Sequence, residues 1–262
     1  MLHHSIYKSE NGSKQWLTFI HGAGGNSSIW FNQVRFFKSY FNVLLIDLRG
    51  HGKSSDSPDE MVYSFDLIIS DLVEVLDYRK IERSHFVGIS LGSILIQKMM
   101  HSHPDRIEKI GLGGAIINLN LQSRILMFMG KLTQTILPFI WIYTFFAYVI
   151  MPYKAHRKSR ALFIREAKKL SENEFRKWYK LTANLLPLLE KIRKREVKIP
   201  TLYIMGSQDY MFLPFVKKIV NLHKYSNLLT LKQSGDLSDP TATFGARIHR
   251  YMLANTIAGP DK

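Results

Sequence analysis

The stretch SHFVGISLG, residues 84–92, decides the fold of this chain. Residues 84–89 are a short, largely apolar run that predicts a buried strand, and residues 91–101 are apolar enough for a buried helix. The turn between them must be tight, because glycines stand two positions before and two positions after Ser90, where side chains would collide. Such a turn strains the serine backbone and lifts its hydroxyl clear of the sheet, towards the N-terminal amides of the following helix.

The same alternation of strand and helix extends to both sides of this turn. Helices are predicted by apolar residues at helical spacing in residues 27–40, 65–76, 91–101 and 214–222. Strands are predicted by short apolar runs at residues 16–20, 43–46, 84–89, 107–112, 201–205 and 227–231. Alternating strands and helices of this length predict an α/β fold with a mostly parallel, doubly wound sheet.

One long segment, residues 119–197, interrupts the alternation with helical sequence throughout. Within it, residues 136–151 are almost continuously apolar, but Pro138 breaks the run, which is shorter than the ~20 residues of a membrane-spanning helix. We therefore expect a helical cap at 119–197, inserted into a core domain made of residues 1–118 and 198–262.

Composition restricts the chemistry and the partners. The chain has no cysteine, which excludes disulfides, thiolate nucleophiles and sulfur-rich metal sites. Its net charge is +15, with basic residues concentrated in 154–198, so anionic partners are favoured, and a cluster at 154–160 follows the apolar run directly. No nucleic-acid module is recognised. Residues 1–12 show no apolar signal-peptide core, so we expect a cytoplasmic protein, with peripheral contact to an anionic membrane as the sharper interpretation of the charge.

Three motifs together resemble the α/β-hydrolase family of serine esterases and lipases. Residues 88–92 match its G-x-S-x-G turn, residues 21–25 (HGAGG) its HG-x-x-G loop, and residues 47–54 (DLRGHGKS) the turn after its next strand. The resemblance implies that Ser90 is the nucleophile and that the backbone amides of Ala23 and Leu91 bind the oxyanion. His21 is expected to anchor its loop, and no cofactor or metal is implied.

The remaining members of a catalytic triad are expected after the cap. Asp209 ends the sequence GSQD, residues 206–209, which resembles the family's acid position, although it could also only cap the next helix. After the last strand the family places its histidine, and here Asp236 stands at that position. Two explanations remain open: His249 replaces the missing base from a terminal helix at 243–254, or the tail from Asp236 onward is altered.

The resemblance implies hydrolysis of carboxylic esters with hydrophobic acyl groups through an acyl-enzyme on Ser90, weakened by the loss of the usual histidine. A lactonase or carbon–carbon bond hydrolase on the same fold is an alternative, and so is a catalytically impaired protein that binds a ligand in the pocket. Epoxide hydrolases and haloalkane dehalogenases are disfavoured, because those relatives have aspartate at the position of Ser90. The sequence gives no indication of the oligomeric state.

Overall fold

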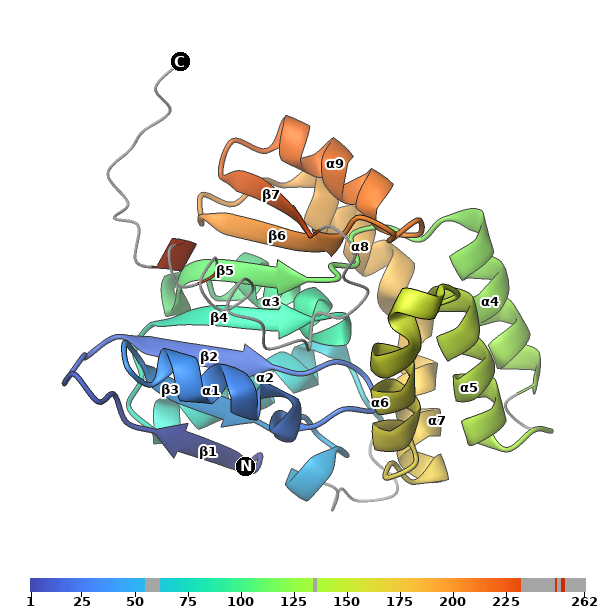
Figure 1. Cartoon of the computed structure of the whole chain (residues 1–262), viewed down its shortest axis with the longest axis horizontal. Coiled ribbons are helices and arrows are strands. Elements are labelled where there is room, and N and C mark those ends of the chain that lie inside the picture. Colours follow the sequence, from blue (N-terminus) through green and yellow to red (C-terminus); the bar gives the residue numbers. More distant parts are fainter. Residues whose placement is uncertain (55–61, 134–135, 232–247, 249–250, 253–262) are drawn as a thin grey trace.

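A computed structural model describes residues 1–54, 62–133, 136–231, 248 and 251–252. Its centre is a seven-stranded sheet with the order β1-β3-β2-β4-β5-β6-β7 (Figure 1). All neighbouring strands are parallel except β1, which pairs antiparallel with β3 at the edge. The strands are β1 (His4–Tyr7), β2 (Trp16–Ile20), β3 (Asn42–Ile46), β4 (Ser84–Ile89), β5 (Ile107–Gly113), β6 (Thr201–Gly206) and β7 (Ser226–Leu231).

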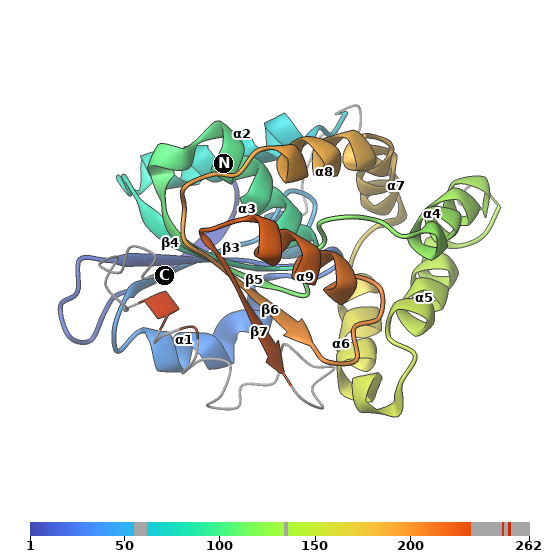
Figure 2. The same cartoon turned by 90° about the horizontal axis from the view of Figure 1, so that it is seen from above.

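Helices cover both faces of the sheet, as a doubly wound fold requires (Figure 2). One face carries α1 (Phe31–Phe37), together with the described residues near the C-terminus, Ile248 and Met252. The other carries α2 (Phe65–Tyr78), α3 (Leu91–Ser102), α8 (Leu185–Lys194) and α9 (Leu213–Leu222), whose buried side chains join one cluster with the sheet. The predicted α/β fold with a mostly parallel sheet is therefore confirmed.

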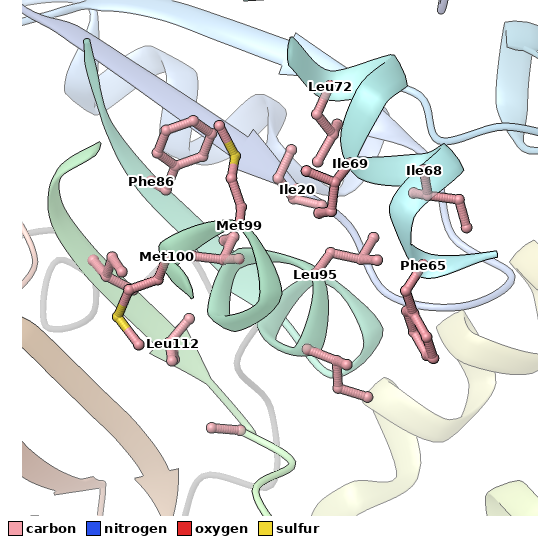
Figure 3. Packing of buried hydrophobic residues seen from close by; sticks show 14 of the residues in the cluster. Ile20, Phe65, Ile68, Ile69, Leu72, Phe86, Leu95, Met99, Met100 and Leu112 are labelled. Carbon is pink, nitrogen blue, oxygen red and sulfur yellow. The ribbon is translucent and has the colours of Figure 1, made fainter. Parts of the chain in front are cut away.

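The packing of α2 and α3 on the sheet fixes the position of the serine turn (Figure 3). Ser64 begins α2 by accepting a hydrogen bond from the amide of Leu67 at 3.0 Å. The helix then buries Ile68, Ile69 and Leu72 against Leu95 and Met99 of α3 and against the sheet. Burial of each such side chain contributes about 1.5–3 kcal/mol, so α3, which begins directly after Ser90, is held firmly.

Helices make up most of the described insertion between β5 and β6. They are α4 (Leu121–Thr133), α5 (Phe139–Ile150), α6 (Arg157–Ala167), α7 (Glu172–Leu181) and α8. Helices α4 to α7 stand at one end of the molecule, beyond the carboxyl ends of the parallel strands (Figure 1), while α8 packs against α3. The division into a cap at 119–197 and a core stays a prediction, and α8 joins the layer that covers the sheet.

The apolar run at residues 136–151 forms α5, which begins directly after Pro138. This agrees with the expected break at the proline, because proline is not tolerated in the interior of a helix. Of the helices in the described part of the chain, none has both the length and the hydropathy needed to cross a bilayer. Several side chains of α5 and its neighbours form a separate small core in the cap, made of Ile142, Tyr143, Ala167, Leu170, Phe175 and Tyr179.

Candidate functional site

Ser90 occupies a strained turn at the carboxyl end of β4. Its backbone has φ 50° and ψ −115°, a conformation that costs roughly 1–3 kcal/mol in a residue other than glycine. Its amide donates to the carbonyl of Gly113 at the end of β5, at 3.1 Å. A Cβ added at Gly88 would lie 2.8 Å from the carbonyl carbon of Gly92, and one added at Gly92 would overlap the carbonyl oxygen of Ile20, so both glycines are sterically required. The sequence pattern of residues 88–92 therefore has the geometry predicted for it.

The second glycine permits a test of this turn. A Cβ at Gly92 would lie 2.8 Å from the carbonyl oxygen of His21, so Gly92→Ala is expected to lower the free energy of unfolding by about 1–3 kcal/mol. Urea denaturation measures the change. Gly111→Ala is the control, because its Cβ would meet only side-chain ends of Met252 and Val87, at 3.3 Å. Equal losses in the two variants would contradict the steric explanation.

The loop after β2 approaches Ser90 closely. A Cβ added at Gly22 would lie 3.3 Å from the Cβ of Ser90, so the two positions are in close contact. The next residue, Ala23, is held from the cap, because the hydroxyl of Tyr143 on α5 donates to its carbonyl oxygen at 2.6 Å. Burial raises the pKa of Tyr143 well above its ordinary value, which keeps the phenol protonated as a donor. The Ala23 peptide is thus oriented by a residue of the insertion.

Two buried histidines fasten the same loop. The Nε2 atom of His21 accepts from the amide of Leu48 at 3.0 Å, and its Nδ1 donates to the carbonyl oxygen of Gly22 at 2.7 Å. His51 acts alike: Nε2 accepts from the amide of Gly24 at 3.0 Å, and Nδ1 lies 3.0 Å from the carbonyl oxygen of Arg49. A ring nitrogen that accepts carries no proton, so both imidazoles are neutral. His21 therefore has the anchoring position expected for it.

These neutral imidazoles predict acid sensitivity. Burial lowers the pKa of His21 to about 3, and it also lowers the pKa of His51 and takes that of His85 to about 4. Because the unfolded chain protonates its histidines near pH 6.5 and the folded chain does not, stability is expected to fall as pH drops from about 6.5 towards 4. Each unit of pKa difference corresponds to about 1.4 kcal/mol.

Urea unfolding at several pH values measures this loss. His85→Phe should make the pH dependence shallower, since it removes one of the groups that must be buried without charge. A free energy of unfolding that is the same at pH 7 and pH 5 would contradict the assignment of neutral, buried imidazoles.

Asp209 lies beyond the carboxyl end of β6, two strands from the end of β4 where Ser90 stands. Its Oδ1 accepts from the amides of Met211 at 3.1 Å and Phe212 at 2.8 Å, just before α9. Burial raises the pKa of Asp209, and the backbone hydrogen bonds oppose the rise. The Asp209 carboxylate thus accepts hydrogen bonds from backbone amides at the start of the next helix. This is the geometry of a helix cap, the alternative to a catalytic role that the sequence left open.

A histidine that the sequence analysis missed lies near Asp209. His156, in the short turn at residues 154–156, is buried, and within the described residues its Nδ1 has no hydrogen-bond partner. Burial and the charge of Arg160 lower the pKa of His156, while the negative charge of Asp209 raises it. In the sequence His156 is a histidine inside the basic cluster 154–160, which lies before the last strand and therefore outside the position where the family places its histidine.

Two other predicted positions, Asp236 and His249, lie outside the described residues. Of the helix predicted at 243–254, the structure assigns helix at Ile248, Tyr251 and Met252. Ile248 and Met252 are buried against the sheet. The structure therefore tests neither the prediction that Asp236 stands at the usual histidine position nor the prediction that His249 acts as the base.

Two cavities meet at Ser90 and Ala23. One, of 170 Å³, is lined by the glycine-rich loop and by Met151, Leu162 and Phe163 from the insertion. The other, of 240 Å³, reaches from Leu91 into the insertion and has an almost entirely apolar lining, which includes Leu126, Met127, Phe146, Ile150, Trp178 and Tyr179. Among the described residues, no group of three histidine, aspartate or glutamate side chains could hold a metal ion. The site thus places Ser90 beside an apolar space that helices of the insertion help to line.

Comparison with known proteins finds hydrolases. The family model described as "alpha/beta hydrolase fold" matches residues 15–136, which contain the three motifs. Pimeloyl-[acyl-carrier protein] methyl ester esterase of Wigglesworthia glossinidia brevipalpis is 26% identical over 81% of this chain and 83% of its own length. 3-Oxoadipate enol-lactonase 2 of Acinetobacter baylyi is 32% identical over 36% of this chain and 34% of its own length.

A solved structure extends the likeness to almost the whole chain. A hydrolase from Pseudomonas aeruginosa superposes with a TM-score of 0.79 at 20% identity, over 96% of this chain and 94% of its own. The family model matches the part of the chain that carries the three motifs. The solved structure has the same fold on both sides of the insertion. The relatives by sequence are hydrolases. The chain therefore has the α/β-hydrolase fold.

Proposed function

We propose that this protein is a serine hydrolase that cleaves carboxylic esters with hydrophobic acyl groups. The observation that carries the proposal is the position of Ser90, at a strained turn facing two cavities whose walls are largely apolar. A carboxylic ester has a carbonyl carbon for the serine oxygen to attack and an acyl chain that suits such walls. The esterase relative, which covers most of the chain, acts on a methyl ester according to its name, and this supports the same bond type.

The chemistry begins with attack of the Ser90 hydroxyl on the ester carbonyl, which forms a tetrahedral intermediate and then an acyl-enzyme with release of the alcohol. The amide of Leu91 belongs to the first turn of α3, where helical N–H groups have no partner within the helix. With the amide of Ala23 it would stabilise the negative oxygen, and the N-terminus of α3 adds a favourable dipole. Water then hydrolyses the acyl-enzyme.

Proton transfer is the weak step of this mechanism. A serine hydroxyl is a poor nucleophile unless a base accepts its proton, and the usual position of that base carries Asp236. A carboxylate has too low a proton affinity to replace an imidazole at neutral pH. Asp209 would orient a histidine and stabilise its charged form, if one reached it. We therefore propose an esterase of low activity in its present sequence.

A series of p-nitrophenyl esters tests the substrate class. Each methylene that enters the apolar cavity contributes up to ~0.8 kcal/mol to transition-state binding, so kcat/KM is expected to rise from acetate towards medium chains. Leu126→Trp, which fills part of the 240 Å³ cavity, should shift the optimum to shorter chains. Leu132→Trp on the exposed side of the same helix is the matched control. A series that falls steadily from acetate upward would contradict the proposal.

Lactone hydrolysis is the second candidate, and the enol-lactonase relative favours it over the motif-bearing part of the chain. A lactone is an internal ester, so the same serine and the same amides would serve. The cavity decides between them, because a compact ring fills less of an extended apolar space than an open acyl chain does. A substrate panel that pairs each lactone with an open-chain ester of equal carbon number separates the two, since the preferred member shows the higher kcat/KM.

A further inference from the structure

The hairpin of α4 and α5 leaves a large apolar surface exposed. On α4, Phe128 is 60% exposed and Leu132 is 58% exposed, and on α5 Trp141 is 65% exposed. Values of this size are unusual for aromatic and aliphatic side chains that gather on one pair of helices. We call this surface the hairpin face, and its residues are Leu121, Ile125, Phe128, Met129, Leu132, Ile136, Leu137, Trp141, Phe145 and Tyr148.

The spacing of these residues makes the exposure systematic. On α4 they recur at 121, 125, 128 and 132, and on α5 at 141, 145 and 148, which is the repeat of one face of a helix. The opposite sides of the two helices are already used, because Leu126, Met127, Phe146 and Ile150 line the apolar cavity beside Ser90. Each helix therefore has one apolar side turned to the cavity and a second apolar side that no other described part of the chain covers.

The hairpin packs tightly enough to hold this face in place. A Cβ added at Gly130 would lie 2.7 Å from the ring of Phe146 on α5, so the two helices are in close contact. The hydroxyl of Tyr179 on α7 donates to the carbonyl oxygen of Met127, which ties α4 to the rest of the insertion. Figures 1 and 2 show α4 and α5 side by side at the end of the molecule, with α4 outermost.

The segment that carries the hairpin face has charge of one sign. Residues 109–165 contain no aspartate or glutamate, although the chain has 21 of them. Within 119–165 the charged side chains are all basic, namely Arg124, Lys131, Lys154, Arg157, Lys158, Arg160 and Arg165. Arg160 lies over the ring of Tyr148, with its guanidinium carbon 4.3 Å from the ring centre, so positive charge reaches the edge of the hairpin face.

We propose that the hairpin face docks the protein on an anionic lipid bilayer. A bilayer surface offers acyl chains for the apolar side chains and acidic headgroups for the basic ones, the two properties that this surface combines. Tryptophan and tyrosine favour the level of the headgroups, and Trp141 and Tyr148 stand at the exposed side of α5. Docking in this way needs no spanning helix.

The proposal goes beyond ester hydrolysis and does not depend on it. Because α4 and α5 also line the cavity at Ser90, docking would bring the wall of that cavity to the membrane surface. Binding is therefore measured with Ser90→Ala protein as well as with the unchanged chain. If both bind alike, lipid docking stands whether or not the serine proves catalytic.

Vesicle flotation of the full chain is the first experiment. The protein is expected to float with vesicles of equal parts phosphatidylcholine and phosphatidylserine, and much less with phosphatidylcholine alone. High salt should weaken the binding, because it screens the basic residues more than the apolar contact. Trp141 provides a second readout: its fluorescence should shift to the blue on binding, since Trp30 and Trp178 are already buried and Trp16 is partly buried in β2. Trp141→Phe should remove most of that shift.

Matched double variants assign the binding to the hairpin face. Phe128→Ser with Leu132→Ser is expected to reduce vesicle affinity by about tenfold or more, because two anchoring side chains are lost. Phe31→Ser with Leu222→Ser removes the same two residue types from the surface of helices α1 and α9, away from the hairpin face. These side chains are 49% and 74% exposed, and their loss should leave the vesicle affinity unchanged. Equal losses in both pairs would overturn the proposal.

A second matched pair tests the charge. Arg157→Glu with Lys158→Glu is expected to weaken binding to the anionic vesicles by at least about tenfold. Lys217→Glu with Lys218→Glu on α9 changes the net charge of the whole chain by the same amount and should have a much smaller effect. If both pairs weaken binding equally, the net charge and not the hairpin face controls it, and the proposal fails.

A second copy of the chain is the competing partner for the hairpin face. Analytical ultracentrifugation without lipid distinguishes it: a stable dimer that the Phe128 and Leu132 substitutions dissociate, together with an absence of vesicle binding, would overturn the lipid proposal. A monomer that binds anionic vesicles supports it.

Discussion

Ser90→Ala is expected to abolish covalent labelling by a fluorophosphonate and to reduce ester hydrolysis to a small residual rate. The serine oxygen is the atom that the proposed mechanism joins to the substrate. The oxyanion-binding amides would remain, and such amides alone can leave a residual rate above that in water. In-gel fluorescence after labelling and initial rates with a p-nitrophenyl ester measure the two effects.

The strained backbone of this residue supplies the control. Alanine cannot relax a φ of 50°, so Ser90→Ala should unfold at nearly the same urea concentration as the unchanged protein. Glycine adopts this conformation freely, so Ser90→Gly should be equally inactive while gaining up to about 1 kcal/mol of stability. Labelling that survives both substitutions would remove Ser90 from the mechanism and leave another nucleophile to be found.

Local motifs made the serine turn predictable. Its glycines are required by contacts within a few residues, such as the approach of position 88 to Gly92, so the pattern in the sequence carries the geometry. The same holds for strands β2 to β6, because a strand buried on both faces needs a continuous apolar run. Strand β1 was missed for the opposite reason: it is short, half-buried and polar at His4 and Ser5, and only its pairing with β3 makes it a strand.

Contacts between distant residues were not predictable in this way. The hydrogen bond from Tyr143 to Ala23 joins residues 120 positions apart, and that from Gly24 to His51 joins residues 27 positions apart. No sequence motif contains either pair of residues, because both hydrogen bonds depend on how the insertion and the loops pack together. The nearness of His156 to Asp209 is of the same kind. The part of the site built by the cap therefore needed the structure, while the part built by the sheet did not.

Asp236→His is the second large effect expected. If this position has the place of the family's histidine, the substitution supplies a base for Ser90 and a partner for Asp209. General base catalysis contributes typically ~10² to 10⁴-fold, so kcat/KM for a preferred ester should rise by orders of magnitude. The gain should follow the protonation of the new imidazole, with activity lost as pH falls below about 6.5. Initial rates over a range of pH measure both.

The double variant Asp236→His with Ser90→Ala separates a restored triad from an unrelated gain. It should be as inactive as Ser90→Ala alone, because members of a triad act as a unit and a base without its nucleophile contributes little. Asp236→Asn is the matched control at the same position: it removes the negative charge without adding a base, and it should give at most a small gain. A gain of equal size with asparagine would mean that repulsion by the aspartate, and not a missing base, had limited the enzyme.

Two histidines offer the alternative that would make this expectation wrong. If the unchanged protein already hydrolyses esters vigorously and His249→Ala silences it, the base comes from the C-terminal segment. If His156→Ala silences it while Tyr153→Ala does not, the buried imidazole beside Asp209 has that role, and the cap supplies part of the catalytic machinery. In either case Asp236→His should bring little, because a serine needs only one proton acceptor. The increase in kcat/KM caused by Asp236→His thus measures whether the unchanged site already contained a general base.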